Sequence, residues 1–195
     1  MYEPFEIGQS FRIIPPEHPP SNDGRIDLIT QRGAFGSGEH ETTVSCLELL
    51  ETLPNIPDKR VLDLGSGTGI LAIAALKLGA ASALCVDIDP AAVKTAQENC
   101  RVNQVDERAL HVCGTLDDIG DDLFDLVLAN IYGDILLAVA PPLVEHTIPG
   151  GDLLLSGILW EYNYDVRNRY ETLHCDLIKN RMLPEFSSLW LKKQS

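Results

Sequence analysis

Residues 61–69 read Val-Leu-Asp-Leu-Gly-Ser-Gly-Thr-Gly, and the apolar run Ile-Leu-Ala-Ile-Ala-Ala follows at residues 70–75. The first run predicts a buried strand, and the second predicts the start of a helix. The glycines between them allow positive φ and let the backbone approach a ligand without a Cβ in the way. A second strand-like run, Ala83–Val86, ends at Asp87. This order of strand, glycine-rich turn, helix, strand and acid is typical of a nucleotide-cofactor site.

The spacing of the glycines favours S-adenosylmethionine over a dinucleotide. The dinucleotide pattern G-x-G-x-x-G needs a third glycine where this chain has Ile70. Asp63 would repel a pyrophosphate but would attract an ammonium and a sulfonium. Asp87 lies about 20 residues beyond the glycines, where a carboxylate accepts hydrogen bonds from ribose hydroxyls. The alternative is a structural glycine turn with a helix-capping acid. The candidate cofactor-binding residues here are Asp63, Gly65, Gly67, Gly69, Asp87 and Ile88.

Composition restricts the classes of partner. The 195 residues are 45% hydrophobic and 23% charged, which fits one globular α/β domain. A formal net charge of -14 disfavours a phosphate-binding surface, so no direct nucleic-acid partner is expected, whereas a basic protein would be attracted. No apolar run approaches the length of a membrane span and no signal sequence is evident, so we expect a soluble protein without a membrane partner.

The five cysteines show no close pair, no C-x-x-C and no zinc-ligand spacing. This usage predicts a reducing, cytoplasmic location and no metal site. Cys85 and Cys113 fall in strand-like runs and are predicted to be buried as small apolar residues.

Strands and helices alternate along most of the chain, which predicts a mainly parallel sheet covered on both faces. Strands are expected at 11–14, 25–30, 60–64, 83–86, 109–112, 124–129, 152–157, 176–180 and 188–192, and helices at 41–53, 70–78, 91–103, 135–146 and 161–173. The turn around Pro184 leaves no room for a crossover helix, so the last two strands should pair antiparallel. The predicted fold class is α/β: a Rossmann-like class I S-adenosylmethionine-dependent methyltransferase with a seven-stranded, mostly parallel sheet and an antiparallel C-terminal hairpin.

Three further segments should meet at the carboxyl ends of the strands, where open α/β sheets bind ligands. The first is the glycine-containing loop 33–43, in which Phe35 and Gly36 would cover the cofactor and Thr43 would lie in the first helical turn. A surface loop followed by N-cap threonines explains it equally well. His40 in this loop would orient the substrate, or would serve only as a cap.

The second segment is Asn130 and its neighbours after an apolar strand. Its side-chain amide is suited to orient a reacting nitrogen, and an Asx turn is the alternative. The third contains Thr115 and Leu116, which would contact an adenine amino group; an acidic surface loop explains this segment almost as well.

Five sequence motifs, taken together and in their order along the chain, resemble those of one protein family. They read GAFGSGEHETT (33–43), DLGSGTGILAIAA (63–75), VDIDP (86–90), ANI (129–131) and LSGIL (155–159). Together they resemble the catalytic domain of the PrmA family, the bacterial methyltransferases of ribosomal protein L-eleven. The resemblance implies S-adenosylmethionine as cofactor, methylation of lysine and N-terminal amines, and cofactor contacts from Thr43, Gly65, Asp87 and Asn130.

The chain departs from the family pattern in three places. Glu41 stands where a proline is usual, and Tyr132 where a small or aliphatic residue is common. The family also carries an N-terminal recognition domain, and this chain begins in what resembles the linker after it. We therefore expect an N-terminal extension with short strands at 1–32 and a methyltransferase domain at 33–195.

The predicted function is S-adenosylmethionine-dependent methylation of lysine or N-terminal amines of a protein, such as a ribosomal protein, with Asn130 as the candidate catalytic residue. The alternatives are a methyltransferase of a small molecule or a non-ribosomal protein, and a noncatalytic cofactor-binding protein. The sequence does not indicate an oligomeric state.

Overall fold

The computed structural model describes residues 3–20, 22–30 and 40–195, and within them the strands form two sheets. The smaller sheet has the order β1-β2-β3, with β1 antiparallel and β3 parallel to β2. The larger sheet has the order β6-β5-β4-β7-β8-β10-β9. The strands are β1 Phe5–Ile7, β2 Phe11–Ile14, β3 Ile26–Ile29, β4 Arg60–Leu64, β5 Ser82–Asp87, β6 Ala109–Cys113, β7 Phe124–Asn130, β8 Thr147–Leu159, β9 Cys175–Met182 and β10 Phe186–Lys193.

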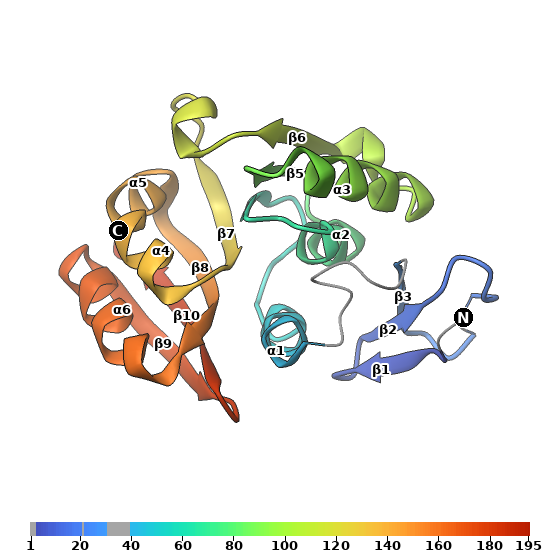
Figure 1. The fold of residues 1–195 in the computed structure, drawn as a ribbon, viewed down its shortest axis with the longest axis horizontal. Helices are drawn as coiled ribbons and strands as arrows, with labels where there is room; N and C mark the ends of the chain where they lie inside the picture. The colour runs from blue at the N-terminus through green and yellow to red at the C-terminus, as the bar shows by residue number, and fades with distance from the viewer. Residues whose placement is uncertain (1–2, 21, 31–39) are drawn as a thin grey trace.

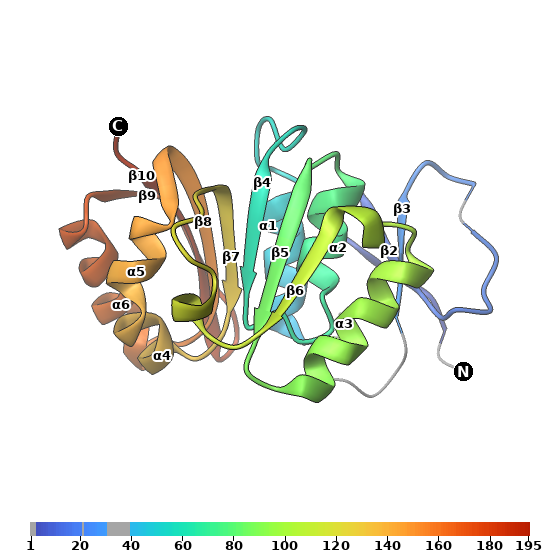
Figure 2. The same ribbon diagram turned by 90° about the horizontal axis from the view of Figure 1, so that it is seen from above.

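Helices cover both faces of the seven-stranded sheet, as Figures 1 and 2 show. They are α1 Glu41–Leu50, α2 Ile70–Lys77, α3 Pro90–Val102, α4 Gly133–Ala138, α5 Ala140–Glu145 and α6 Trp160–Thr172, with short 3-10 helices η1 Asp106–Arg108 and η2 Leu116–Asp118. One hydrophobic core lies under α1, α2 and α3, and a second lies under α4, α5 and α6. The predicted α/β architecture, a seven-stranded, mostly parallel sheet with an antiparallel C-terminal hairpin, is confirmed.

The order of the strands places a ligand site at the carboxyl-terminal ends of the central strands. From β4 the chain continues to β5 on one side and later returns to β7 on the other, both parallel to β4. The crossover connections therefore diverge at β4, and a crevice opens at the carboxyl ends of these strands. The glycine-rich turn, Asp87 and Asn130 all follow strands at this end of the sheet.

The N-terminal sheet packs against the side of the molecule that carries α1 and α2 (Figure 1). Its buried side chains Ile7, Phe11, Ile13 and Leu28 belong to the same hydrophobic core as α1 and α2. The sequence did not predict β1, which has only three residues. The boundary expected at residue 32 falls outside the described residues and stays a prediction.

Two local predictions are wrong. The single helix expected at 135–146 is two helices, because Pro141 and Pro142 are tolerated in the first turn of α5 but would remove hydrogen bonds inside a continuous helix. Cys113 is exposed rather than buried, because it ends the edge strand β6 at the open side of the sheet.

In the part of the chain that the structure describes, no helix is both long enough and apolar enough to cross a membrane.

Candidate functional site

The glycine-rich turn between β4 and α2 adopts a conformation that needs its glycines. Gly65, Gly67 and Gly69 have φ angles of 69°, 53° and 76°, which side chains rarely adopt. The amides of Gly65 and Ser66 donate to the carbonyl of Val86 in β5, over 2.8 and 3.1 Å. Backbone hydrogen bonds alone therefore fix the start of the turn to the neighbouring strand.

Asp87 holds the two loops of the crevice together. Its Oδ2 accepts from the amide of Gly67 at 2.8 Å, and its Oδ1 accepts from the amide of Asp89 at 3.0 Å. One carboxylate thus orders both the glycine turn and the start of α3. Each oxygen retains a further lone pair for a ligand hydroxyl.

Asp63 is buried at the base of the same site, with 1% of its surface exposed. Its Oδ2 accepts from the amide of Ala72, in the first turn of α2, at 3.1 Å. Burial raises the pKa of Asp63 to about 7; the Ala72 N–H opposes this shift, and the negative charge of Asp87 adds to it. The carboxyl group is therefore easily converted between its neutral and charged forms near neutral pH.

A cavity of about 620 Å³ opens where these loops meet. This volume is typical of a small-molecule site. Of the predicted residues, Gly65, Gly67, Asp87, Ile88 and Asn130 line it.

A smaller cavity of about 40 Å³ adjoins the larger one, since Gly65, Gly67 and Asn130 line both. Thr43 and Asp63 line the smaller cavity, and so does Ser66, whose buried Oγ has no hydrogen-bond partner. A buried polar atom without a partner is costly, so this space suits a polar or cationic group. The two cavities together fit a molecule with an apolar ring system and a charged end, as in S-adenosylmethionine.

Asn130 ends β7 with its side chain directed at α1. Its Nδ2 donates to Oγ1 of Thr43 at 3.3 Å, which leaves its Oδ1 as an acceptor toward the cavity it lines. The next residue, Ile131, is held in place because its backbone N–H donates a hydrogen bond to the carbonyl of Ser156 at 3.1 Å. Helix α1 therefore holds the side-chain amide of Asn130, and strand β8 holds the backbone that follows it.

Other predicted residues lie elsewhere. Gly69 lines neither cavity: a Cβ there would be 3.1 Å from Cβ of Ala96, so this glycine allows α2 and α3 to approach. Thr115 caps η2, and Leu116 is 6% exposed; neither lines a cavity. Phe35 and Gly36 lie outside the described residues. The roles of all these residues stay predictions.

The sequence analysis missed the wall of the cavity that β10 forms. Phe186 in β10 lines it, and its ring meets that of His40 edge-on at 5.4 Å between centroids. His40 is the N-cap of α1, accepting from the amide of Thr42, and it also lines the cavity, so its role in orienting the substrate stays a prediction. Glu41 accepts from the amide of Glu185, which ties α1 to the turn before β10. No sequence signal joins residues so far apart.

The described residues include no cluster of three or more histidine, cysteine, aspartate or glutamate side chains able to hold a metal ion.

Comparison with known proteins identifies the family. The family model described as "Ribosomal protein L11 methyltransferase (PrmA)" matches residues 1–194. The chain belongs to the PrmA family. The resemblance seen in the sequence is thereby confirmed.

Relatives within the PrmA family are similar over most of this chain. The ribosomal protein L11 methyltransferase of Trichlorobacter lovleyi is 45% identical over 177 residues, which cover 87% of this chain and 58% of the relative. That of Geotalea uraniireducens is 38% identical over 207 residues, covering 100% of this chain and 65% of the relative. The chain thus spans less than two thirds of the length of these PrmA relatives.

A solved structure extends the comparison. The ribosomal protein L11 methylase of Lactobacillus delbrueckii subsp. bulgaricus has a TM-score of 0.89 and 27% identity, covering 100% of this chain and 99% of that one.

A glycine in the fifth PrmA motif, Gly157 after Ser156, is the subject of a first prediction. Gly157 has a φ of +80°, and a Cβ there would lie 2.6 Å from the carbonyl oxygen of Ile131. We expect Gly157→Ala to lower the free energy of unfolding by about 2 to 3 kcal/mol, since it adds strain and a backbone clash. Urea denaturation measures this loss.

Gly120→Ala is the matched control, because Gly120 also has a positive φ, +66°, but a Cβ there meets nothing within 4 Å. Equal losses in the two variants would show that the contact with Ile131 is unimportant.

Proposed function

We propose that this chain is an S-adenosylmethionine-dependent N-methyltransferase acting on lysine or N-terminal amines of a ribosomal protein, L11. The single observation that carries the proposal is the cavity in which the Asp87-ordered glycine turn and Asn130 meet, in a chain of the PrmA family. S-adenosylmethionine would supply an electrophilic methyl group and would leave as S-adenosylhomocysteine.

The two cavities support the following assignment of cofactor contacts. Asp87 accepts hydrogen bonds from ribose hydroxyls through its remaining lone pairs. Asp63, with Ser66 beside it, balances the charge of the ammonium group. Ile88, which is 76% exposed at the rim of the cavity, offers an apolar surface to the adenine. We retain Thr115 and Leu116 as proposed contacts of the adenine amino group, and Phe35, Gly36, Thr43 and Gly69 as proposed contacts of the cofactor.

The residues of this chain act mainly by alignment. The Nδ2 of Asn130 donates to Thr43, so its Oδ1 remains to accept from an N–H of the amine and would thereby orient the nitrogen lone pair for attack. Alignment of this kind removes much of the entropic barrier to a displacement. The amine must be neutral to attack, and the apolar wall formed by Ile131 and Phe186 favours its neutral form.

The substrate is a basic protein in the cytoplasm. A net charge of -14 attracts a cationic partner. We further propose that residues 1–32 form an extension and residues 33–195 the methyltransferase domain, with neither nucleic acid nor membrane as a direct partner.

The test is transfer of labelled methyl from S-adenosylmethionine to purified L11, with Asp87→Ala as the binding-deficient control. Label in L11 that depends on Asp87 supports the proposal. Label only in other proteins or small molecules of a cell lysate overturns the choice of substrate. Cofactor binding with no transfer to any acceptor indicates a noncatalytic protein.

A further inference from the structure

The N-terminal sheet is joined to the carboxyl-terminal ends of the three helices on its side of the molecule. Glu51, the C-cap of α1, accepts from the amides of Gln9 and Ser10 over 2.8 to 3.1 Å. Lys77, the last residue of α2, donates to the carbonyl of Asp27 at 2.7 Å. Asn103, the C-cap of α3, bonds to Ile29. The opposite ends of these helices frame the cavity, so the sheet and the cavity share the same supports.

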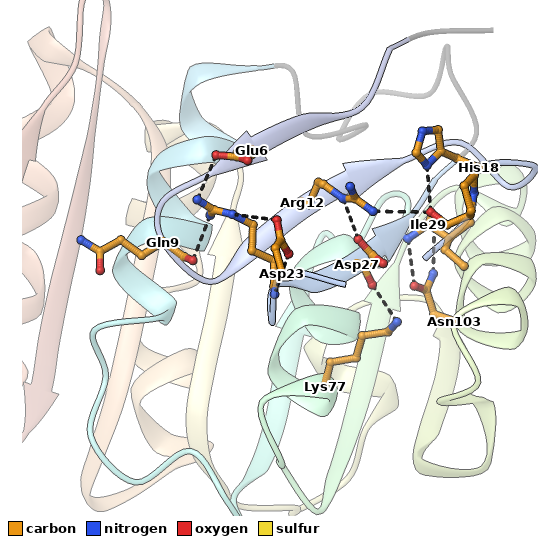
Figure 3. Close-up of polar contacts among 11 residues, drawn as sticks. Glu6, Gln9, Arg12, His18, Asp23, Asp27, Ile29, Lys77 and Asn103 are labelled. Atoms are coloured by element: carbon orange, nitrogen blue, oxygen red, sulfur yellow. Dashed lines mark hydrogen bonds and ion pairs between the residues drawn. The ribbon is translucent and has the colours of Figure 1, made fainter. Parts of the chain in front are cut away.

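Asn103 acts on β3 as a neighbouring strand would. Its Oδ1 accepts from the amide of Ile29 at 2.9 Å, and its Nδ2 donates to the carbonyl of the same residue at 2.8 Å (Figure 3). Asn103 is 5% exposed. It thereby satisfies both backbone groups at an edge of β3 that would otherwise be left without a strand partner.

A second asparagine continues this path to the glycine turn. Nδ2 of Asn103 also donates to the carbonyl of Asn99, one turn earlier in α3, at 2.8 Å. Nδ2 of Asn99 donates in turn to the carbonyl of Thr68 at 2.9 Å, and Asn99 is 4% exposed. Thr68 lines both cavities. A buried path of amide hydrogen bonds therefore runs from Ile29 to the cofactor turn.

We infer that Asn99 and Asn103 are positioning residues of the cofactor site, through which the N-terminal sheet holds the glycine-rich turn in its binding conformation. This inference rests on the proposed function, because the ligand of the turn is S-adenosylmethionine. The N-terminal sheet would then stabilise the cavity, in addition to preceding the methyltransferase domain in the chain. Neither asparagine lines a cavity, so both act only through Thr68.

The physical basis is the hydrogen bond by which Asn99 ties the second half of the turn to α3, whereas Val86 and Asp87 hold the first half. Three glycines with positive φ leave its backbone intrinsically free, since glycine loses most entropy when it is fixed. The carbonyl of Thr68 is held by an amide that is itself rigid, because α3 packs against Gly69 through Ala96. Asn99→Ala removes the hydrogen bond to the carbonyl of Thr68, and Asn103→Ala removes those to Ile29 and one of those to the carbonyl of Asn99. The turn is therefore expected to shift in both variants.

The experiment measures the dissociation constant of S-adenosylhomocysteine by calorimetry for Asn99→Ala, Asn103→Ala and the double variant. We expect each single variant to bind about five- to tenfold more weakly. The double variant should bind no more weakly than the weaker single variant, because the two residues act in series.

Asn163→Ala is the matched control. Asn163 is also a buried asparagine with two donated bonds, at 3.1 Å to Asn180 and 2.8 Å to Ser187, but these join α6 to β9 and β10. We expect this control to lower the melting temperature like the other variants and to leave the dissociation constant unchanged.

Three results overturn the inference: unchanged affinity in Asn99→Ala and Asn103→Ala, a double-variant loss equal to the product of the single losses, or an equal loss of affinity in the control.

If the wild-type protein binds neither S-adenosylhomocysteine nor S-adenosylmethionine, the proposed function is overturned. The positioning role can then still be tested by a measurement that needs no ligand. Amide hydrogen exchange is then followed at Gly69, whose N–H bonds to Ser66 in the wild type. Faster exchange in Asn103→Ala than in Asn163→Ala supports the positioning role without any ligand. Equal exchange overturns it.

Discussion

Asp87→Ala is expected to weaken the binding of S-adenosylhomocysteine about 100-fold. The variant removes two hydrogen bonds that a carboxylate accepts from the backbone, at 2.8 Å from Gly67 and 3.0 Å from Asp89. Hydrogen bonds to a charged group contribute about 1.5 to 3 kcal/mol each, and about 1.4 kcal/mol corresponds to a tenfold change in affinity. Part of this loss of affinity is offset because the freed amides can bond to water. Loss of the proposed hydrogen bonds to the ribose weakens binding further. Calorimetry measures the change.

Two further variants make the result specific. Asp87→Asn keeps the size of the side chain and one acceptor oxygen, so its affinity should lie between those of the wild type and Asp87→Ala. Asp122→Ala removes an exposed carboxylate, paired with Arg60 at 2.9 Å, and should leave binding unchanged. An affinity of Asp87→Ala within twofold of the wild type would show that Asp87 does not order the site.

The second large effect concerns Asp63 and pH. Burial raises the pKa of Asp63 from 3.8 to about 7, so between these values the folded protein holds a proton that the unfolded chain has lost. The free energy of unfolding therefore decreases as pH rises through this range, by at most about 1.4 kcal/mol per pH unit. Asp63→Asn removes this contribution. We expect the variant to be more stable than the wild type at pH 8, by up to about 4 kcal/mol, and the difference to shrink toward pH 4.

The same group should make cofactor affinity depend on pH. The ammonium group of S-adenosylhomocysteine prefers the charged carboxylate, so binding to the wild type should strengthen as pH rises through about 7. Asp63→Asn should bind more weakly above pH 7 and lose this dependence. Denaturation and calorimetry at pH 5, 6, 7 and 8 measure both effects.

The matched control is Asp125→Asn, since Asp125 is a partly exposed carboxylate that also accepts a backbone N–H, from Arg60 at 2.8 Å. If Asp63→Asn and the wild type differ by a constant stability at every pH, Asp63 does not titrate in this range.

Local patterns were sufficient to predict the central part of the fold. The run of residues 61–75 predicted β4, the turn and α2, because glycine conformation and apolar periodicity act over a few residues. The acid at the end of β5 was placed by its spacing alone, and the structure brings Asp87 to within 2.8 Å of the turn. The same reasoning gave the antiparallel pairing of β9 and β10.

Contacts between distant segments could not be predicted in this way. Phe186 reaches the cavity only because β10 lies between β8 and β9, and no periodicity encodes that position. No local pattern distinguishes Asn99 of α3 or its C-cap Asn103 from other polar helix residues, although both are buried and bonded to other segments. Cys113 was misplaced because an edge strand and an interior strand have similar apolar patterns.

The position of β10 has a consequence for synthesis on the ribosome. β10 follows β9 in the chain yet occupies an interior place, with β8 on one side and β9 on the other. A nascent chain that has emerged only as far as β9 therefore lacks the strand that joins β9 to the rest of the sheet, along with the aromatic wall of the cavity. Domains are assembled as units once their segments are available. The seven-stranded sheet, and with it the Phe186 wall of the cavity, is thus complete only once residues 186–193 are available to pair with β8 and β9.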